Sequence, residues 1–301
     1  MSDIMRPVPF DALLARIFGE YRARRSIFDI AEGQFYRKPD DRLISVFGET
    51  CATPVGPAAG PHTQLAQNIV ASWLTGGRFI ELKTVQIMDR LEIAKPCIDA
   101  GDECYNTEWS SEFTLPKAFD EYLKAWFALH LLEEIFDPRL DGEARSFSFN
   151  MSVGYDLAGI RQAPMQQFID SMIDARAHPR FAEYLGTLER WVGDEAFIRD
   201  LGLDGRRTRL QGLPGRIDSR MARGVTLSTM HGCPPREIEA ICRYMLEEKS
   251  LNTFVKLNPT LLGFDRVRAI LDTCGFGYLT LKRESFAHDL PQDEAVPMLR
   301  R

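Results

Sequence analysis

Residues 224–235 include, in one short loop, three side chains that could accept or donate a proton. The segment reads Gly-Val-Thr-Leu-Ser-Thr-Met-His-Gly-Cys-Pro-Pro and contains Thr229, His231 and Cys233. A cysteine near a helix N-terminus and an imidazole is expected to have a lowered pKa and to act as a general base or nucleophile. We therefore expect Thr229, His231 and Cys233 to be the catalytic candidates, with Ser228 in contact with substrate.

Two other interpretations of this loop remain open. A buried thiol beside a surface histidine would have a purely structural role. The His-x-Cys spacing is compatible with metal ligands, but two ligands do not make a site, and we predict no metal site.

Two lysines end apolar, β-patterned runs at equivalent places. Lys83 lies at the end of the run 78–84, and Lys256 lies in the run 253–257. At the mouth of a parallel barrel, such an ammonium group can meet a phosphate, an anionic flavin or a carbonyl. A lysine that extends from a strand end into solvent is the simpler alternative. A Schiff base formed by Lys256 is a third interpretation.

Two further segments could contact a ligand. Asn150 follows a β-patterned run and offers both a hydrogen-bond donor and an acceptor. Gly56, Ala58, Ala59 and Gly60 form a loop of small residues, which would let a flat ligand approach the backbone closely.

Alternating strands and helices must position these groups. The apolar patterns predict strands at 78–84, 146–153, 224–228, 253–257 and 278–282. They predict helices at 9–25, 63–74, 117–136, 163–176, 179–201, 235–249 and 264–273. This alternation is typical of parallel βαβ units, and no G-x-G-x-x-G motif follows the first strand, so we do not expect a Rossmann site.

A (β/α)8 TIM barrel fits the alternation better, because polar residues repeatedly follow the strands. The patterns supply only five or six of eight strands, so we expect an α/β barrel that is incomplete at its C-terminus. We predict an N-terminal helical extension at 1–48 and a truncated barrel at 49–301, with a helical insertion near 177–222.

Composition excludes several classes of protein. The net charge of −6 argues against nucleic acid as a partner. The sequence has neither an apolar run of about eighteen residues nor a signal-peptide pattern, so we predict no membrane span and a cytoplasmic location. Six cysteines without a C-x-x-C pair fit neither a zinc ribbon nor a ferredoxin-type cluster.

Along essentially its whole length, the sequence resembles the family described as YgfK-type selenate reductase subunits, which are iron–sulfur flavoproteins. The most distinctive segments are 45–114, 149–155 and 224–264. At its strand ends the chain is also similar to the FMN barrels of dihydroorotate and dihydropyrimidine dehydrogenases. The resemblance implies a dihydroorotate dehydrogenase-like fold and FMN-dependent transfer of electrons or a hydride.

The resemblance also assigns residues to the cofactor and the substrate. The positions that match the flavin contacts of these barrels are Ala58, Ala59, Gly60, Lys83, Thr84, Asn150 and Lys256. Asn106 matches an asparagine that holds flavin or substrate. The lysine that corresponds to Lys256 lies near flavin N1 and O2, where a positive charge stabilises the reduced, anionic isoalloxazine.

The chain departs from the dehydrogenases in the loop after residue 224. Where they read Leu-Asn-Leu-Ser-Cys-Pro, this chain has Thr226 in place of the asparagine and Thr229 in place of the base cysteine. Cys233 lies four residues after Thr229, so it replaces that base only if the loop folds back.

The resemblance implies partners beyond these 301 residues. The glycine-rich phosphate loops of the last two barrel strands have no counterpart, so we expect weak or absent FMN binding by this chain alone. We expect electron-transfer modules or subunits and a small-molecule substrate as partners. FAD, NADPH and 4Fe-4S clusters are expected only in longer family members. The alternative function is a flavin-free barrel scaffold that docks electron-transfer modules.

Overall fold

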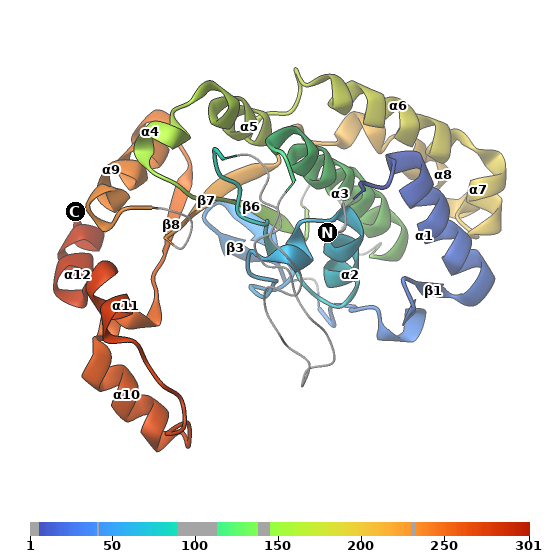
Figure 1. Cartoon of the computed structure of the whole chain (residues 1–301). Coiled ribbons are helices and arrows are strands. Elements are labelled where there is room, and N and C mark those ends of the chain that lie inside the picture. Colours follow the sequence, from blue (N-terminus) through green and yellow to red (C-terminus); the bar gives the residue numbers. More distant parts are fainter. Residues whose placement is uncertain (1–5, 41, 89–112, 138–144, 230–232) are drawn as a thin grey trace.

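The computed structural model describes residues 6–40, 42–88, 113–137, 145–229 and 233–301 (Figure 1). Within them, four strands form one parallel sheet in the order β5-β6-β7-β8. The strands are β5 (Phe79–Glu81), β6 (Ser148–Val153), β7 (Ala222–Ser228) and β8 (Asn252–Lys256). Each new strand is added beside the previous one, as in a barrel built from successive βαβ units.

Helices and short hairpins surround this sheet. The longer helices are α1 (Phe10–Arg24), α2 (Ala66–Leu74), α3 (Leu115–Phe136), α5 (Ala163–Ile173), α6 (Pro179–Gly193), α10 (Phe264–Thr273) and α12 (Gln292–Arg300). The shorter helices are α4 (Leu157–Ile160), α7 (Glu195–Asp200), α8 (Arg207–Gln211), α9 (Ile238–Arg243), which continues as a π-helical turn (Tyr244–Glu248), and α11 (Arg283–His288). The hairpins pair β1 (Ser26–Ile27) with β2 (Ile30–Ala31), and β3 (Ile44–Val46) with β4 (Glu49–Cys51).

The two faces of the sheet differ in chemistry, because paired residues of parallel strands share a face. The face toward the helices is apolar, and Phe149 of β6 packs on Trp126 of α3 with ring centroids 5.1 Å apart. The opposite, inner face carries a row of polar side chains. Phe79 and Phe254 also lie on this face. Its polar residues on and just after the strands include Glu81, Lys83, Asn150, Ser152, Thr226, Ser228 and Lys256.

A segment with two prolines runs along the side of β5 opposite to β6. The carbonyls of Val55 and Pro57 accept hydrogen bonds from the N–H groups of Phe79 (3.2 Å) and Glu81 (3.1 Å). Prolines 54 and 57 have no N–H to donate, which explains why the segment is not a regular strand. A Cβ on Gly56 would overlap the carbonyl oxygen of Phe79, so this close approach requires glycine.

The predicted strand at 278–282 is wrong. The segment is coil between α10 and α11, and the Tyr278 side chain is 77% exposed. Its alternating pattern finds no neighbouring strand among the described residues, and a strand needs a backbone partner to form.

Other boundaries shift for local reasons. The predicted helix 179–201 is interrupted at Asp194, whose side chain accepts a hydrogen bond from the N–H of Ala196 and caps α7. The segment 202–222, inside the predicted helical insertion, contains the short helix α8, and β7 begins two residues before the predicted 224. The segment between α1 and α2 contains the two hairpins. None of the described helices is long and apolar enough to cross a membrane.

Candidate functional site

The carboxyl ends of the four strands bring several predicted residues to the inner face of the sheet. Lys256, at the end of β8, forms an ion pair with Glu81 of β5, with 3.0 Å between Nζ and Oε1. The two strands are not neighbours, so this ion pair spans β6 and β7. The Lys256 side chain is 33% exposed and the Glu81 side chain 13% exposed, and the ammonium group is therefore held at the edge of the polar row.

Asn150 lies in the middle of this row and is almost completely buried. Its Nδ2 donates to Thr226 Oγ1 at 2.6 Å, which fixes the orientation of the amide. Its Oδ1 has no hydrogen-bond partner among the described residues. A Cβ on Gly224 of β7 would collide with that oxygen. The glycine therefore keeps the position beside Asn150 Oδ1 free of a side chain. A buried acceptor without a partner is uncommon and is a place where a ligand donor would fit.

Lys83 and Thr84 follow β5 and are both buried. The Lys83 ammonium group donates to the carbonyl of Thr84 at 3.2 Å, and the hydroxyl of Tyr122 in α3 donates to the carbonyl of Lys83. Thr84 and Ser152 share a hydrogen bond of 2.8 Å between their hydroxyls. These contacts order the end of β5 against β6.

The loop of small residues lies beside the end of β5. Ala58 is exposed, whereas Ala59 and Gly60 are partly buried. The hydroxyl of Thr63 accepts from the N–H of Gly60 at 3.2 Å, and the Lys83 N–H reaches the Thr63 carbonyl at 3.4 Å. The loop is therefore tied to the same strand end as Lys83, and Ala58 is its exposed residue.

Two of the predicted catalytic residues, Thr229 and Cys233, line one small cavity of about 40 Å³. Such a volume holds a water molecule or two but no flavin or sugar-sized substrate. The Thr229 hydroxyl donates to the carbonyl of Lys256 at 2.9 Å, and Ser228 is buried at the end of β7. His231 and Asn106 lie outside the described residues.

The expected lowering of the Cys233 pKa is wrong. Burial, together with the nearby Cys242, Glu237 and Asp156, raises the pKa of the Cys233 thiol to about 12. The helical run that follows begins with a 3₁₀ turn (Pro235–Glu237) and continues as α9, and the acidic Glu237 in its first turn offsets the positive potential of the helix N-terminus. A thiol with this pKa is neutral near pH 7.

Sequence reasoning missed Glu81 and gave no site role to Thr226. A charged residue inside the run 78–84 is the signal that could have identified Glu81, since glutamate is disfavoured in a buried strand. Its pairing with Lys256 could not be found this way, because the contact joins distant parts of the chain. Among the described residues, no group of three His, Cys, Asp or Glu side chains is placed to hold a metal ion.

The geometry defines the class of protein. Parallel strands added in chain order, helices outside and polar groups at the carboxyl strand ends describe part of an α/β barrel. The chain belongs to the family described as "Oxidoreductase YgfK, N-terminal TIM-barrel domain", whose model matches residues 28–301.

Two curated relatives agree with this family. The chain is 70% identical over 301 residues to "Putative oxidoreductase YgfK" of Escherichia coli strain K12, and equally to that of Escherichia coli O157:H7. Each match covers 100% of this chain but only 29% of the relative. The chain therefore spans less than a third of the length of these relatives.

Proposed function

We propose that this chain is an FMN-binding oxidoreductase domain that transfers electrons or a hydride within a larger iron–sulfur flavoprotein. The observation that carries the proposal is the buried Oδ1 of Asn150, an acceptor without a partner on the inner face that also presents Lys256. Membership of an oxidoreductase family supports it. Selenate is the acceptor that the family resemblance implies, and electrons would reach it through the modules of longer relatives.

The residues present suit FMN chemically. Asn150 Oδ1 would accept a hydrogen bond from an N–H or O–H of the ligand, and Lys256 would face its anionic side. The loop at Ala58 would meet the flat ring through its backbone, beside the strand end that carries Lys83. Bound FMN would supply an isoalloxazine ring able to accept a hydride or single electrons. Glu81 holds the Lys256 ammonium group in place and offsets part of its charge.

A flavin titration tests the proposal. FMN fluorescence is followed while this chain, and separately the complete Escherichia coli relative, is added. We expect quenching by the relative and weak or no quenching by the 301 residues. Replacing the residue of the relative that aligns with Lys256 by Met should weaken binding at least about tenfold, since a charge-assisted contact is lost.

The matched control is the residue that aligns with Lys249, which pairs with Asp170 on the outer helices at 2.6 Å. Its replacement by Met also removes an ion pair but should leave FMN binding unchanged. In the relative, the residue that aligns with Glu81 is also replaced by Gln together with the Met replacement at the position of Lys256. This double variant removes the ammonium group without leaving a buried carboxylate unpaired. If the complete relative does not bind FMN, the proposal is wrong.

The flavin-free scaffold is the second candidate, favoured by the high pKa of Cys233 and by the ion pair that already engages Lys256. It predicts that Ala at the positions of Lys83 and Lys256 leaves the activity of the complete protein unchanged. The FMN proposal predicts that both replacements lower it.

A further inference from the structure

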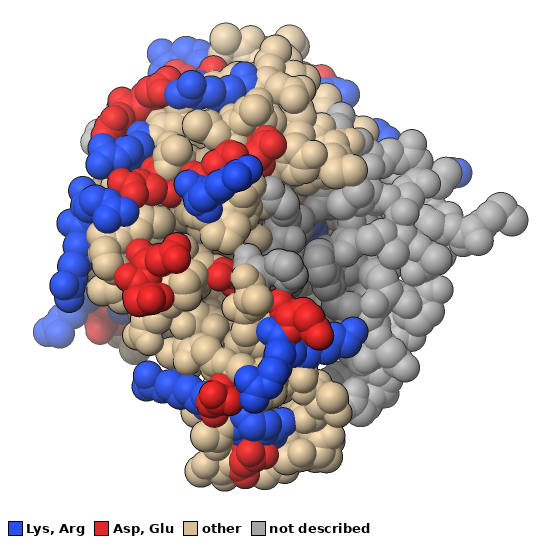
Figure 2. All heavy atoms as spheres, turned by 60° about the vertical axis from the view of Figure 1, so that its left-hand side comes forward, with Lys and Arg blue, Asp and Glu red and all other residues tan. Residues whose placement is uncertain are grey.

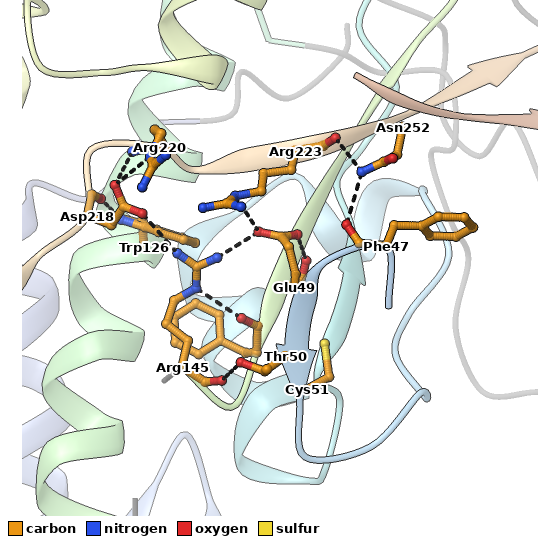
Figure 3. A network of polar contacts seen from close by, with 12 residues as sticks. Phe47, Glu49, Thr50, Cys51, Trp126, Arg145, Asp218, Arg220, Arg223 and Asn252 are labelled. Atoms are coloured by element: carbon orange, nitrogen blue, oxygen red, sulfur yellow. Dashed lines mark hydrogen bonds and ion pairs between the residues drawn. The ribbon is translucent and has the colours of Figure 1, made fainter. Parts of the chain in front are cut away.

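A second polar cluster lies at the opposite, amino-terminal ends of the strands (Figure 3). It surrounds a cavity of about 520 Å³, which is in the range of small-molecule sites. We call this cavity the arginine pocket. Its five arginines are Arg145, Arg209, Arg216, Arg220 and Arg223.

Arg145 is the fixed centre of the arginine pocket. Its Nη2 donates to Glu49 of β4 at 2.7 Å, and its guanidinium lies over the ring of Trp126 at 4.5 Å. Its Nη1 is 3.8 Å from Asp218, whose carbonyl accepts the indole N–H of Trp126. These contacts hold one guanidinium group in a single orientation against the wall of the cavity.

Arg220 and Arg223 are held more loosely at the mouth. Their side chains are 57% and 42% exposed, and the ion pair of Arg223 with Glu49 is long, at 4.0 Å. Arg220 reaches Asp218 through Nε at 3.3 Å. Figure 3 shows the guanidinium groups of both residues near that of Arg145. Three guanidinium groups therefore lie together, and two of them are accessible to solvent.

Two of the five arginines, Arg209 and Arg216, are already paired with the Glu134 carboxylate, and Asp137 also lines the cavity. Two further buried groups add little negative charge. The Glu133 carboxyl accepts hydrogen bonds from the backbone N–H (2.8 Å) and the hydroxyl of Ser146, and burial raises its pKa to about 7. Burial lowers the pKa of His130 to about 3, so its imidazole is neutral, and its Nε2 has no partner among the described residues. His130 therefore offers a ligand one more polar contact.

We propose that the arginine pocket binds a small anion with two or more phosphate groups. Clustered guanidinium groups match phosphate oxygens through paired hydrogen bonds, and their planar shape makes arginine suited to this task. In TIM barrels the residues at the amino-terminal ends of the strands normally contribute to the stability of the fold, whereas the catalytic residues lie at the carboxyl ends. A ligand here would lie at the other end of the strands from the inner-face residues of the proposed FMN site.

Calorimetric titration of the 301-residue chain with inorganic pyrophosphate and tripolyphosphate, at constant ionic strength, tests the proposal. We expect saturable binding of one anion per chain. The double variant Arg220→Gln/Arg223→Gln should bind at least about tenfold more weakly, because hydrogen bonds to charged groups are lost. The matched control, Arg180→Gln/Arg190→Gln on α6, removes two exposed arginines and should bind as the unchanged chain does.

The FMN site could also attract phosphate, so Lys256→Gln is a further arm. Weaker binding in Lys256→Gln, with the arginine variant unchanged, would assign the anion to the inner face and overturn the proposal. Equal weakening in the α6 control would show a nonspecific charge effect and would overturn the proposal. The absence of any binding would overturn it too. If the arginine variant does not fold, the indole N–H resonance of Trp126 in the unchanged chain decides, since a bound anion beside Arg145 must shift it.

Discussion

At the residue scale, Glu133 couples the stability of the fold to pH. Its carboxyl is buried in α3, and burial raises its pKa from 4.5 to about 7, although the hydrogen bonds from Ser146 and the charge of Arg78 act in the opposite direction. Between these two values the folded chain keeps a proton that the unfolded chain releases. The free energy of unfolding therefore falls as the pH rises from about 4.5 to 7, and this contribution is constant above that range.

The substitution Glu133→Gln should remove this dependence while keeping an oxygen to accept from Ser146. We expect it to raise the free energy of unfolding at pH 8 by up to about 3 kcal/mol, and to change it little near pH 4. Urea unfolding at both pH values measures the difference. Glu189→Gln, at an exposed position on α6, is the control and should have no effect at either pH. A gain at pH 4 as large as that at pH 8 would contradict the assignment.

The sequence indicated some site residues but not their interactions. Lys83 and Lys256 were found because each ends an apolar run, a pattern that depends only on neighbouring residues. The Glu81–Lys256 ion pair joins strands that are not paired with each other in the sheet, so no local pattern contains it. The pKa of Cys233 was predicted in the wrong direction because it depends on burial, which the sequence around it does not reveal.

At the element scale, two glycines allow a direct test of the segment beside β5. Gly56 lies where a Cβ would overlap the Phe79 carbonyl, whereas a Cβ on Gly186 in α6 would have nothing within 4 Å. We expect Gly56→Ala to lower the free energy of unfolding by about 2 kcal/mol or more, because the segment must move away from β5. Gly186→Ala should raise it by about 0.5–1 kcal/mol through helix propensity. Thermal unfolding of both variants provides the comparison, and similar behaviour would contradict the packing described.

A helix was found at every predicted helical segment, whereas one predicted strand was wrong, and the difference has a physical reason. The bounds of α1, α3 and α10 agree with the predicted 9–25, 117–136 and 264–273 within two residues. A helix satisfies its own backbone, so its periodic face is visible locally. A strand depends on a partner elsewhere in the chain, which is why the alternating segment at 278–282 misled the prediction. The extended segment around Gly56 that runs beside β5 was not predicted, because its prolines interrupt the strand pattern in the sequence.

At the scale of the whole molecule, burial is distributed unevenly. In α3, 18 of 22 residues are buried, whereas α10 has no buried residue. The C-terminal helices extend away from the sheet beyond β8 (Figure 1). The face that includes them carries charges of both signs, interspersed (Figure 2). Arg301 of α12 pairs with Glu239 of α9, and Arg268 pairs with Asp272 within α10.

This gradient should appear in hydrogen exchange. We expect the amides of α10 to exchange at least about a hundredfold faster than those of α3, because few buried contacts oppose local opening. Mass-spectrometric exchange on peptic peptides measures both helices. The experiment is repeated at several protein concentrations, since self-association would protect α10 only at the higher ones. Equal protection of α3 and α10 in the dilute sample would contradict the difference in packing.

The contact between α1 and α6 has a consequence for synthesis on the ribosome. The Trp191 indole donates to Asp11 at 2.7 Å, and these residues lie 180 positions apart. At about 5–20 residues per second, α1 is complete roughly 10–40 s before its partner helix is translated. During that interval the apolar face of α1 lacks α6, so the nascent chain offers a binding site to chaperones that disappears when α6 packs.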